Sequence, residues 1–482
     1  MKKGYILLQI LAIFFLGLIT PKVQSQSTSF CNYDSTAIET TINRPEFARS
    51  RWGILLQDLD SGCTIYSLDA EKYFIPASNA KLLTTAAALL ELGANFRITT
   101  PIYAVGEPPF LDSLIIQGQG DPSLSTSKLR DIVQQLQSLG IQRIEKLIID
   151  DSYFADFQLN PTWEWLDVYS YYGASVNSLI LNENTFTLTV LPGRIGEPVS
   201  LHWSDAIALQ QLQVSNQGIT TTADQDYNID LEGVLGKPIL KILGEIPVDH
   251  GTDVWDLAII DPANYFLETF RNLLSQSGIK VNHAEITYQE NNYSEAEIVT
   301  RIVSPPLPVL LAEINQNSNN LYAEAILKIL GEKLNTDDNI EAMKLSLAKL
   351  GIDPESYVLE DGSGLSRHNL IPPDLLVELL SAIAKTPQGE IYQDSLAIAR
   401  VNGTLKNRFR HSTVPLNLWG KTGTLTGVTT LSGYLETISG KRIVFSILVN
   451  NSDQKNKISR QAIDEIILLI NNSTNYKRLS NF

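Results

Sequence analysis

Histidine is scarce in this sequence. Only five occur among 482 residues, and no two stand at the short spacings of metal-binding motifs. They are His202, His250, His283, His368 and His411. We therefore expect neither a metal centre nor a cofactor. A Ser-His-Asp triad does not require close spacing and stays open, but no Gly-x-Ser-x-Gly sequence marks a nucleophile for it.

Cysteine is rarer still, since Cys31 and Cys63 are the only two. In an exported protein they could form a disulfide that ties the N-terminal arm to the first predicted hairpin. Two unpaired thiols are the alternative.

Basic residues are outnumbered, with 37 Lys and Arg against 53 Asp and Glu, and the formal net charge is −16. No cluster of Lys and Arg forms a basic stripe. Because binding to nucleic acid needs a positively charged footprint, this balance excludes nucleic acid as a partner.

A run long enough to cross a membrane is missing near the N-terminus. Residues 5–19 are apolar, but the stretch is short for a membrane span. Lys2 and Lys3 precede it, and residues 23–25 provide a small-residue cleavage site. The pattern predicts a cleaved signal peptide over residues 1–25 and a periplasmic protein, with secretion or membrane association through an uncleaved anchor as alternatives.

The two ends of the remaining chain share one pattern. Residues 52–56 and 64–68 are apolar stretches around a turn and predict a β-hairpin. Residues 429–437 and 442–449 predict another, followed by a helix at 458–470 with one apolar face. We expect strands from both ends to join one antiparallel sheet backed by helices.

The middle of the chain has a different sequence pattern. Short strand-like runs separated by turns fill residues 99–299, and residues 305–308 mark the return to a helical pattern. The economical interpretation is an α+β catalytic domain with a β-rich insertion. The predicted division is a signal peptide at 1–25, a catalytic domain at 26–97 and 300–482, a first inserted domain at 98–190 and 255–299, and a second at 191–254.

Three short motifs stand in a fixed order: Ser78-x-x-Lys81, Ser318-x-Asn320 and Lys421-Thr-Gly423. Ser-x-x-Lys also occurs at 125, 277, 346 and 452, but only Ser78 follows a Pro-Ala pair and opens a long apolar run that ends at a glycine. This trio is typical of penicillin-binding proteins and class A β-lactamases.

These residue types suit acyl transfer. A serine hydroxyl is a poor nucleophile without a base, and on a helix Lys81 can reach Ser78 because positions i and i+3 are neighbours. Burial and a second cation, Lys421, would lower the pKa of Lys81 enough for it to accept a proton. Ser318 could relay a proton and Asn320 could position substrate, although a polar helix cap is the alternative for this motif.

The motifs resemble those of the low-molecular-mass class C penicillin-binding proteins, the D-alanyl-D-alanine carboxypeptidase/endopeptidase family of peptidase S13. The resemblance spans the mature chain and its long insertion, and it rests on residues 76–81, 118–122, 317–320, 361–367, 403–405 and 420–425. It implies a fold like that of penicillin-binding proteins and β-lactamases with a two-domain insertion. It also implies that peptidoglycan stem peptides are substrates and that β-lactams acylate the enzyme.

The resemblance also implies roles for single residues. Ser78 is acylated, Lys81 is the base, and Ser318 with Asn320 forms the second element. The substrate carboxylate is held by Lys421, Thr422 and Thr424, and the backbone N–H groups of Ser78 and Thr424 form the oxyanion hole. Gly423 has no side chain, and we expect it to let a substrate backbone approach closely.

An aromatic stretch of the insertion is similar to the family's pocket for the free end of the diamino acid. It contains Trp165, Asp167 and Tyr172. A carboxylate would bind an ammonium group there, and a tyrosine would pack beside it. A core loop rich in aromatic residues is the alternative. For the whole chain, a β-lactamase and a non-enzymatic wall-binding scaffold are the rival functions.

Overall fold

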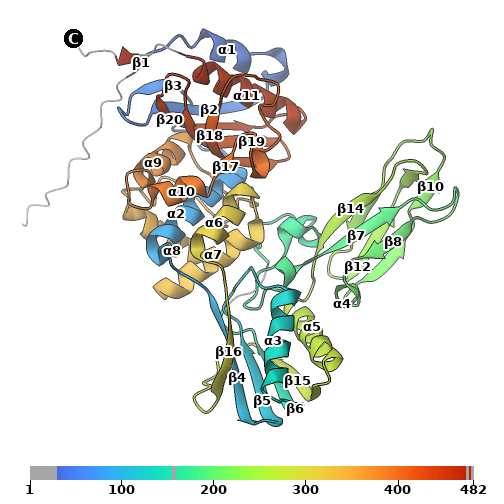
Figure 1. The fold of residues 1–482 in the computed structure, drawn as a ribbon. Coiled ribbons are helices and arrows are strands. Elements are labelled where there is room, and N and C mark those ends of the chain that lie inside the picture. The colour runs from blue at the N-terminus through green and yellow to red at the C-terminus, as the bar shows by residue number, and fades with distance from the viewer. Residues whose placement is uncertain (1–29, 155–158, 474–476, 479–482) are drawn as a thin grey trace, which may run out of the picture.

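The computed structural model describes residues 30–154, 159–473 and 477–478, so the predicted signal peptide at 1–25 lies outside the described residues. Figure 1 shows a compact part made from both ends of the chain, and a long insertion that extends from it in two lobes. Within the described residues, no helix is long and apolar enough to cross a membrane.

The compact part is built on a six-stranded antiparallel sheet in which the two chain ends meet. Its order is β17 (Ala397–Ile398), β18 (Asn417–Leu425), β19 (Val428–Glu436), β20 (Arg442–Asn450), β2 (Arg51–Asp58) and β3 (Thr64–Leu68). Strand β2 pairs with β20 along its whole length, from Arg51 opposite Asn450 to Asp58 opposite Ile443. The two predicted hairpins and their union in one sheet are therefore confirmed.

Helices cover both faces of this sheet (Figure 1). One face is covered by α1 (Thr36–Ile42) and α11 (Asn456–Asn471), and the other by α9 (Pro373–Ile383). Below α9 lie α2 (Lys81–Leu92), α6 (Leu307–Gln316), α7 (Asn320–Leu334), α8 (Asn339–Ala348) and α10 (Gly389–Asp394). Helix α2 is buried from Lys81 to Leu89, which explains why its sequence is mostly apolar.

The first lobe of the insertion contains a five-stranded mixed sheet. Its order is β15 (Lys280–Thr287), β6 (Arg143–Asp150), β5 (Phe110–Gln117), β4 (Thr99–Glu107) and β16 (Glu297–Val303). Two helices pack on it, α3 (Thr126–Ser138) and α5 (Pro262–Gln276). The expectation of a β-rich insertion did not include these helices, although α3 shows helical spacing of its buried residues 129, 132, 133 and 136.

The second lobe consists of small sheets. They contain β7 (Thr185–Leu191), β8 (Ser200–Trp203), β9 (Gln213–Asn216), β10 (Ile219–Thr221), β11 (Asp230–Gly233), β12 (Ile239–Leu243), β13 (Glu245–Pro247) and β14 (Asp253–Ala258), with α4 (Ala206–Leu209) beside them. Strands β7 and β14 pair from Thr185 opposite Ala258 to Val190 opposite Asp253. The predicted borders near residues 190 and 254 thus cut through one sheet. The predicted return to the catalytic domain at residue 300 lies inside β16. In both places the strand pairing continues past the position where the composition of the sequence changes.

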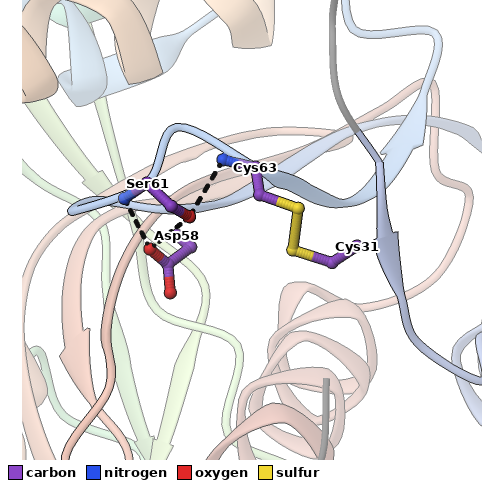
Figure 2. The surroundings of a disulfide bond; sticks show 4 residues. All are labelled: Cys31, Asp58, Ser61 and Cys63. Carbon is purple, nitrogen blue, oxygen red and sulfur yellow. Dashed lines mark hydrogen bonds between the residues drawn. A yellow bond between two sulfur atoms is a disulfide. The ribbon is translucent and has the colours of Figure 1, made fainter. Parts of the chain in front are cut away.

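A disulfide joins Cys31 in β1 (Cys31–Asn32) to Cys63 before β3, so the two cysteines are paired rather than free thiols (Figure 2). The turn beside Cys63 is held by Asp58, whose Oδ1 accepts from Ser61 N at 2.8 Å and Ser61 Oγ at 2.7 Å. β1 also pairs with β21 (Lys477–Arg478), so the bond anchors both terminal arms to the sheet.

Removing this disulfide should destabilise the protein. The bond closes a loop with a sequence separation of 32, and loss of that constraint on the unfolded chain costs about 4 kcal/mol. We expect the double variant Cys31→Ala/Cys63→Ala to lose that much free energy of unfolding in urea titration. Wild type under reductant is the control and should unfold at the same urea concentration as the variant. An unchanged midpoint in both would show that the bond contributes nothing.

Candidate active site

Ser78 stands on a short 3-10 turn, Ala77–Ala80, that leads directly into α2. The residue before it, Ala77, has a φ of 46°, in the left-handed region that a non-glycine residue adopts at a cost. Ser78 lines a cleft of about 660 Å³ between the compact part and the insertion, which we call the Ser78 cleft. The predicted nucleophile is thus presented to a cavity at the start of a buried helix.

Lys81 is fully buried, and its Nζ makes three hydrogen bonds. It donates to Asn320 Oδ1 at 2.6 Å and to Ser363 O at 2.5 Å, and it lies 3.1 Å from Ser78 Oγ. Burial lowers the pKa of Lys81 to about 7, an effect opposed by nearby carboxylates. When Lys81 is neutral, two N–H bonds go to the two carbonyl acceptors, so its lone pair is directed at the Ser78 hydroxyl.

Lys421 forms a second buried lysine–serine pair. Its Nζ donates to Ser318 Oγ and to Thr422 O, both at 2.8 Å. Burial, and then the charge of Lys81, lower the pKa of Lys421 well below its usual value. Ser318 has a φ of 63° in the break between α6 and α7 and lines the Ser78 cleft, so its hydroxyl stands between Lys421 and the space for a substrate.

Asn320 is bonded on both ends of its amide. Its Oδ1 accepts from Lys81, and its Nδ2 donates to Tyr172 O of the insertion at 2.8 Å. The alternative of a helix cap is also realised, but by the neighbouring Asn319, whose side chain accepts from Tyr322 N at 3.1 Å. The motif therefore both starts α7 and supplies the site.

Strand β18 forms one wall of the cleft. Thr422 and Thr424 line it, and Thr422 Oγ1 donates to Thr404 Oγ1 at 2.8 Å. Gly423 faces the other way: a Cβ there would lie 2.2 Å from Thr430 Oγ1 and 2.9 Å from Ser78 N. Glycine is thus needed here for the strand to approach the nucleophile turn, and the approach of a substrate backbone to Gly423 stays a prediction.

The aromatic stretch of the insertion lies at the opposite wall. Asp167 and Tyr172 line the cleft, and burial raises the pKa of the Asp167 carboxyl. Trp165 is 45% exposed and lies outside the cleft lining, so its place in the pocket stays a prediction. Trp163 also lies outside the cleft lining, but its Nε1 donates to Asp361 Oδ2 at 2.8 Å in the loop that carries Ser363.

Two buried carboxylates behind Lys81 were missed by reasoning from chemistry alone. Glu324 Oε1 accepts from Gly362 N and Ser363 N at 3.0 and 2.7 Å, and Asp361 lies one residue before that pair. Burial, and then the charge of Asp361, raise the pKa of Glu324 to about 7. The sequence signal for Asp361 is the segment at residues 361–367, which carries part of the resemblance to the family.

The remaining charges of the cleft are mostly acidic. Its lining includes Glu164, Glu183 and Glu313, while Arg367 supplies the positive charge. In the described part of the chain, no group of three or more His, Cys, Asp and Glu side chains is arranged to hold a metal ion.

A serine beside a buried lysine of lowered pKa, with a second lysine–serine pair across a cleft, defines a serine hydrolase of the acyl-enzyme type. A sequence profile of the D-Ala-D-Ala carboxypeptidase 3 (S13) family matches residues 35–469. The chain therefore belongs to that family, as the motifs indicated.

Individual relatives agree along most of their length. A penicillin-sensitive carboxypeptidase A from Dictyostelium discoideum is 29% identical over 84% of this chain and 83% of its own. A D-alanyl-D-alanine carboxypeptidase from Actinomadura sp. strain R39 is 29% identical over 86% of this chain and 80% of its own. The crystal structure of penicillin binding protein 4 from Haemophilus influenzae superposes with a TM-score of 0.79 at 25% identity, covering 90% of this chain and 98% of that chain. The expected α+β fold is confirmed.

Proposed function

We propose that this protein is a serine DD-peptidase that removes the terminal D-alanine from peptidoglycan stem peptides through an acyl-Ser78 intermediate, and that it also cleaves crosslinks between D-alanine and a diamino acid. The observation that carries this proposal is the bond of Lys81 to Ser78 Oγ inside a cleft that also holds the Lys421–Ser318 pair. The family and its named carboxypeptidases support the same activity.

In acylation, Ser78 Oγ attacks the carbonyl carbon of the penultimate D-Ala, and Lys81 Nζ takes the hydroxyl proton. The developing oxyanion is held by the backbone N–H groups of Ser78 and Thr424. The proton passes by way of the Ser318 hydroxyl to the nitrogen of the leaving residue, so the peptide bond breaks and an ester to Ser78 forms. Water then attacks the ester carbonyl while Lys81 takes its proton; the bond from the acyl carbon to Ser78 Oγ breaks, Lys81 returns the proton to Oγ, and the shortened peptide leaves as a carboxylic acid.

The cleft offers complementary groups for both ends of such a substrate. The hydroxyls of Thr422 and Thr424 bind the terminal carboxylate, with Lys421 Nζ bonded to the Thr422 carbonyl beside them. Asp167 and Tyr172 bind the ammonium of the diamino acid at the opposite wall. β-Lactams enter as substrate mimics and acylate Ser78, which agrees with the penicillin sensitivity named for the Dictyostelium relative. The N-terminal pattern supports export to the periplasm.

Asp167→Asn should weaken recognition of the diamino acid, and the loss should be confined to peptides with a free side-chain ammonium. Loss of a charge-assisted bond costs about 1.5–3 kcal/mol, or about 10- to 100-fold in kcat/KM, for a peptide with a free side-chain ammonium. The same peptide with that amine acetylated should be cleaved equally by both proteins. If wild type and Asp167→Asn cleave the free-amine peptide with equal kcat/KM, Asp167 does not bind the ammonium group.

Three assays on the wild-type protein test the proposal. D-Alanine release from a stem pentapeptide, together with one persistent penicillin adduct in intact-mass spectrometry, would support it. Rapid turnover of a chromogenic lactam would favour the β-lactamase instead, because a peptidase stalls as the acyl-enzyme. Binding to peptidoglycan with neither adduct nor cleavage would favour the scaffold.

A further inference from the structure

Residues 159–173 of the insertion, here called the aromatic segment, lie against the compact part and contact a loop behind the catalytic lysine. Four side-chain contacts join this segment to the loop at residues 360–367. They run from Asn160 Nδ2 to Glu360 O at 2.5 Å, from Thr162 Oγ1 to Ser366 Oγ at 2.7 Å, from Trp163 Nε1 to Asp361 Oδ2 at 2.8 Å, and between Arg367 Nε and Glu164 Oε1 at 3.2 Å.

Asp361 is the residue that shapes the loop. It is 1% exposed, and its carboxylate accepts from Gly364 N at 2.8 Å, Ser366 N at 2.7 Å and Asn369 Nδ2 at 2.7 Å. The turn held in this way directs the Ser363 carbonyl at Lys81 Nζ, 2.5 Å away. One of the two acceptors that orient Lys81 therefore depends on the carboxylate that Trp163 contacts.

The other acceptor also leads back to the aromatic segment. Lys81 donates to Asn320 Oδ1, and the same amide donates through Nδ2 to Tyr172 O. Apart from Ser78, both partners of Lys81 are thus bonded to, or held by, the aromatic segment. That segment also carries Asp167 and Tyr172, whose side chains line the Ser78 cleft.

We propose that Trp163 is a positioning residue, which through Asp361 and the Ser363 carbonyl makes the alignment of Lys81 with Ser78 depend on the aromatic segment that holds the ammonium end of the substrate. This inference rests on the proposed function. A substrate that fills the pocket at Asp167 orders the segment, and the order is passed to the base; a substrate without the ammonium leaves the base less well aligned.

The pH dependence separates this role from simple support of the fold. The charged groups that face Lys81 are Lys421 from β18, Glu324 from α7 and Asp361 from the loop. A carbonyl that accepts from the ammonium form favours that form, so loosening Ser363 should let Lys81 lose its proton more easily. The acid limb of the rate profile then moves to lower pH while the plateau falls.

The matched pair of variants is Trp163→Phe and Trp255→Phe. Trp255 makes the same kind of bond, from Nε1 to Asp253 Oδ2 at 2.8 Å, but in β14. We expect Trp163→Phe to slow acylation by benzylpenicillin about 10- to 100-fold, with the acid limb at lower pH, because misalignment of reacting groups is costly. Trp255→Phe should behave as wild type. Trp163→His retains a ring N–H and should recover part of the acylation rate. It also serves as the test variant if Trp163→Phe does not fold.

A second readout uses two stem peptides, one with a free side-chain ammonium and one with that amine acetylated. Wild type should cleave the free-amine peptide with the higher kcat, and Trp163→Phe should reduce that kcat advantage. If Trp163→Phe has the same rates and pH profile as Trp255→Phe, or loses the same fraction of its rate at every pH, the positioning role of Trp163 is wrong. Penicillin labelling of wild type would in that case still support the peptidase. Absence of any adduct on wild type would overturn both.

Discussion

Ser78→Ala is expected to abolish the penicillin adduct and to lower D-alanine release by about 10⁴-fold or more. The acyl-enzyme route disappears with the hydroxyl, and only substrate binding and oxyanion stabilisation remain, which is the residual activity seen when a serine nucleophile is lost. The fold should persist, because Ser78 lines a cleft and gives up only its bond with Lys81. Intact-mass spectrometry and peptide hydrolysis are the two measurements.

The chain provides a matched control for this variant. Ser125 begins another Ser-x-x-Lys sequence, but it caps α3, where its side chain accepts from Lys128 N. Ser125→Ala should cost about 1 kcal/mol of stability through loss of the cap and leave labelling and hydrolysis unchanged. Penicillin bound covalently to Ser78→Ala, or labelling lost in Ser125→Ala alone, would contradict the assignment of the nucleophile.

Lys81→Met should have the next largest effect, about 10³- to 10⁴-fold on the rate of acylation, because proton abstraction from Ser78 loses its base. In wild type the rate should rise with pH as Lys81 becomes neutral, with a midpoint near the pKa of about 7. The sign follows from burial, which disfavours the ammonium and so leaves much of the lysine able to accept a proton at neutral pH. The variant should show no such limb.

Stopped-flow acylation between about pH 5 and pH 9 checks this expectation. Methionine fills the volume of the lysine stem, so circular dichroism should show a folded variant whose buried site no longer holds a desolvated charge. An acid limb near pH 7 that survives in Lys81→Met would assign that limb to another group. Glu324, whose pKa is also raised to about 7, would then be the candidate.

Local sequence patterns predicted the elements of the fold that depend on residues close together in the sequence. The hairpins at β2–β3 and β19–β20 and the helices α2 and α11 follow directly from apolar periodicity and turn residues. The two long helices of the insertion, α3 and α5, were not predicted, because strand-like runs dominate its sequence. The borders between the two inserted domains remain a prediction, because the paired strands β7 and β14 each extend across one of them.

The catalytic motifs themselves could be read from the sequence, since Ser78, Lys81, Ser318, Asn320 and Lys421 all converge on one site. The roles of Trp163 and Gly423 could not. A tryptophan's hydrogen-bond partner and the space beside a glycine are set by chain segments far away in the sequence.

The sequence alone determined which chemical groups are present, in what order, and that Lys81 would stand one helical turn from Ser78. Only the tertiary structure decided that both lysines are buried, that Asn320 and Ser363 orient the lone pair of Lys81, and that the insertion is bonded to Asn320 and to Asp361 in the loop that carries Ser363. The reason is physical. Helical spacing acts over a few residues, whereas desolvation and hydrogen-bond geometry depend on every segment that packs around the buried group.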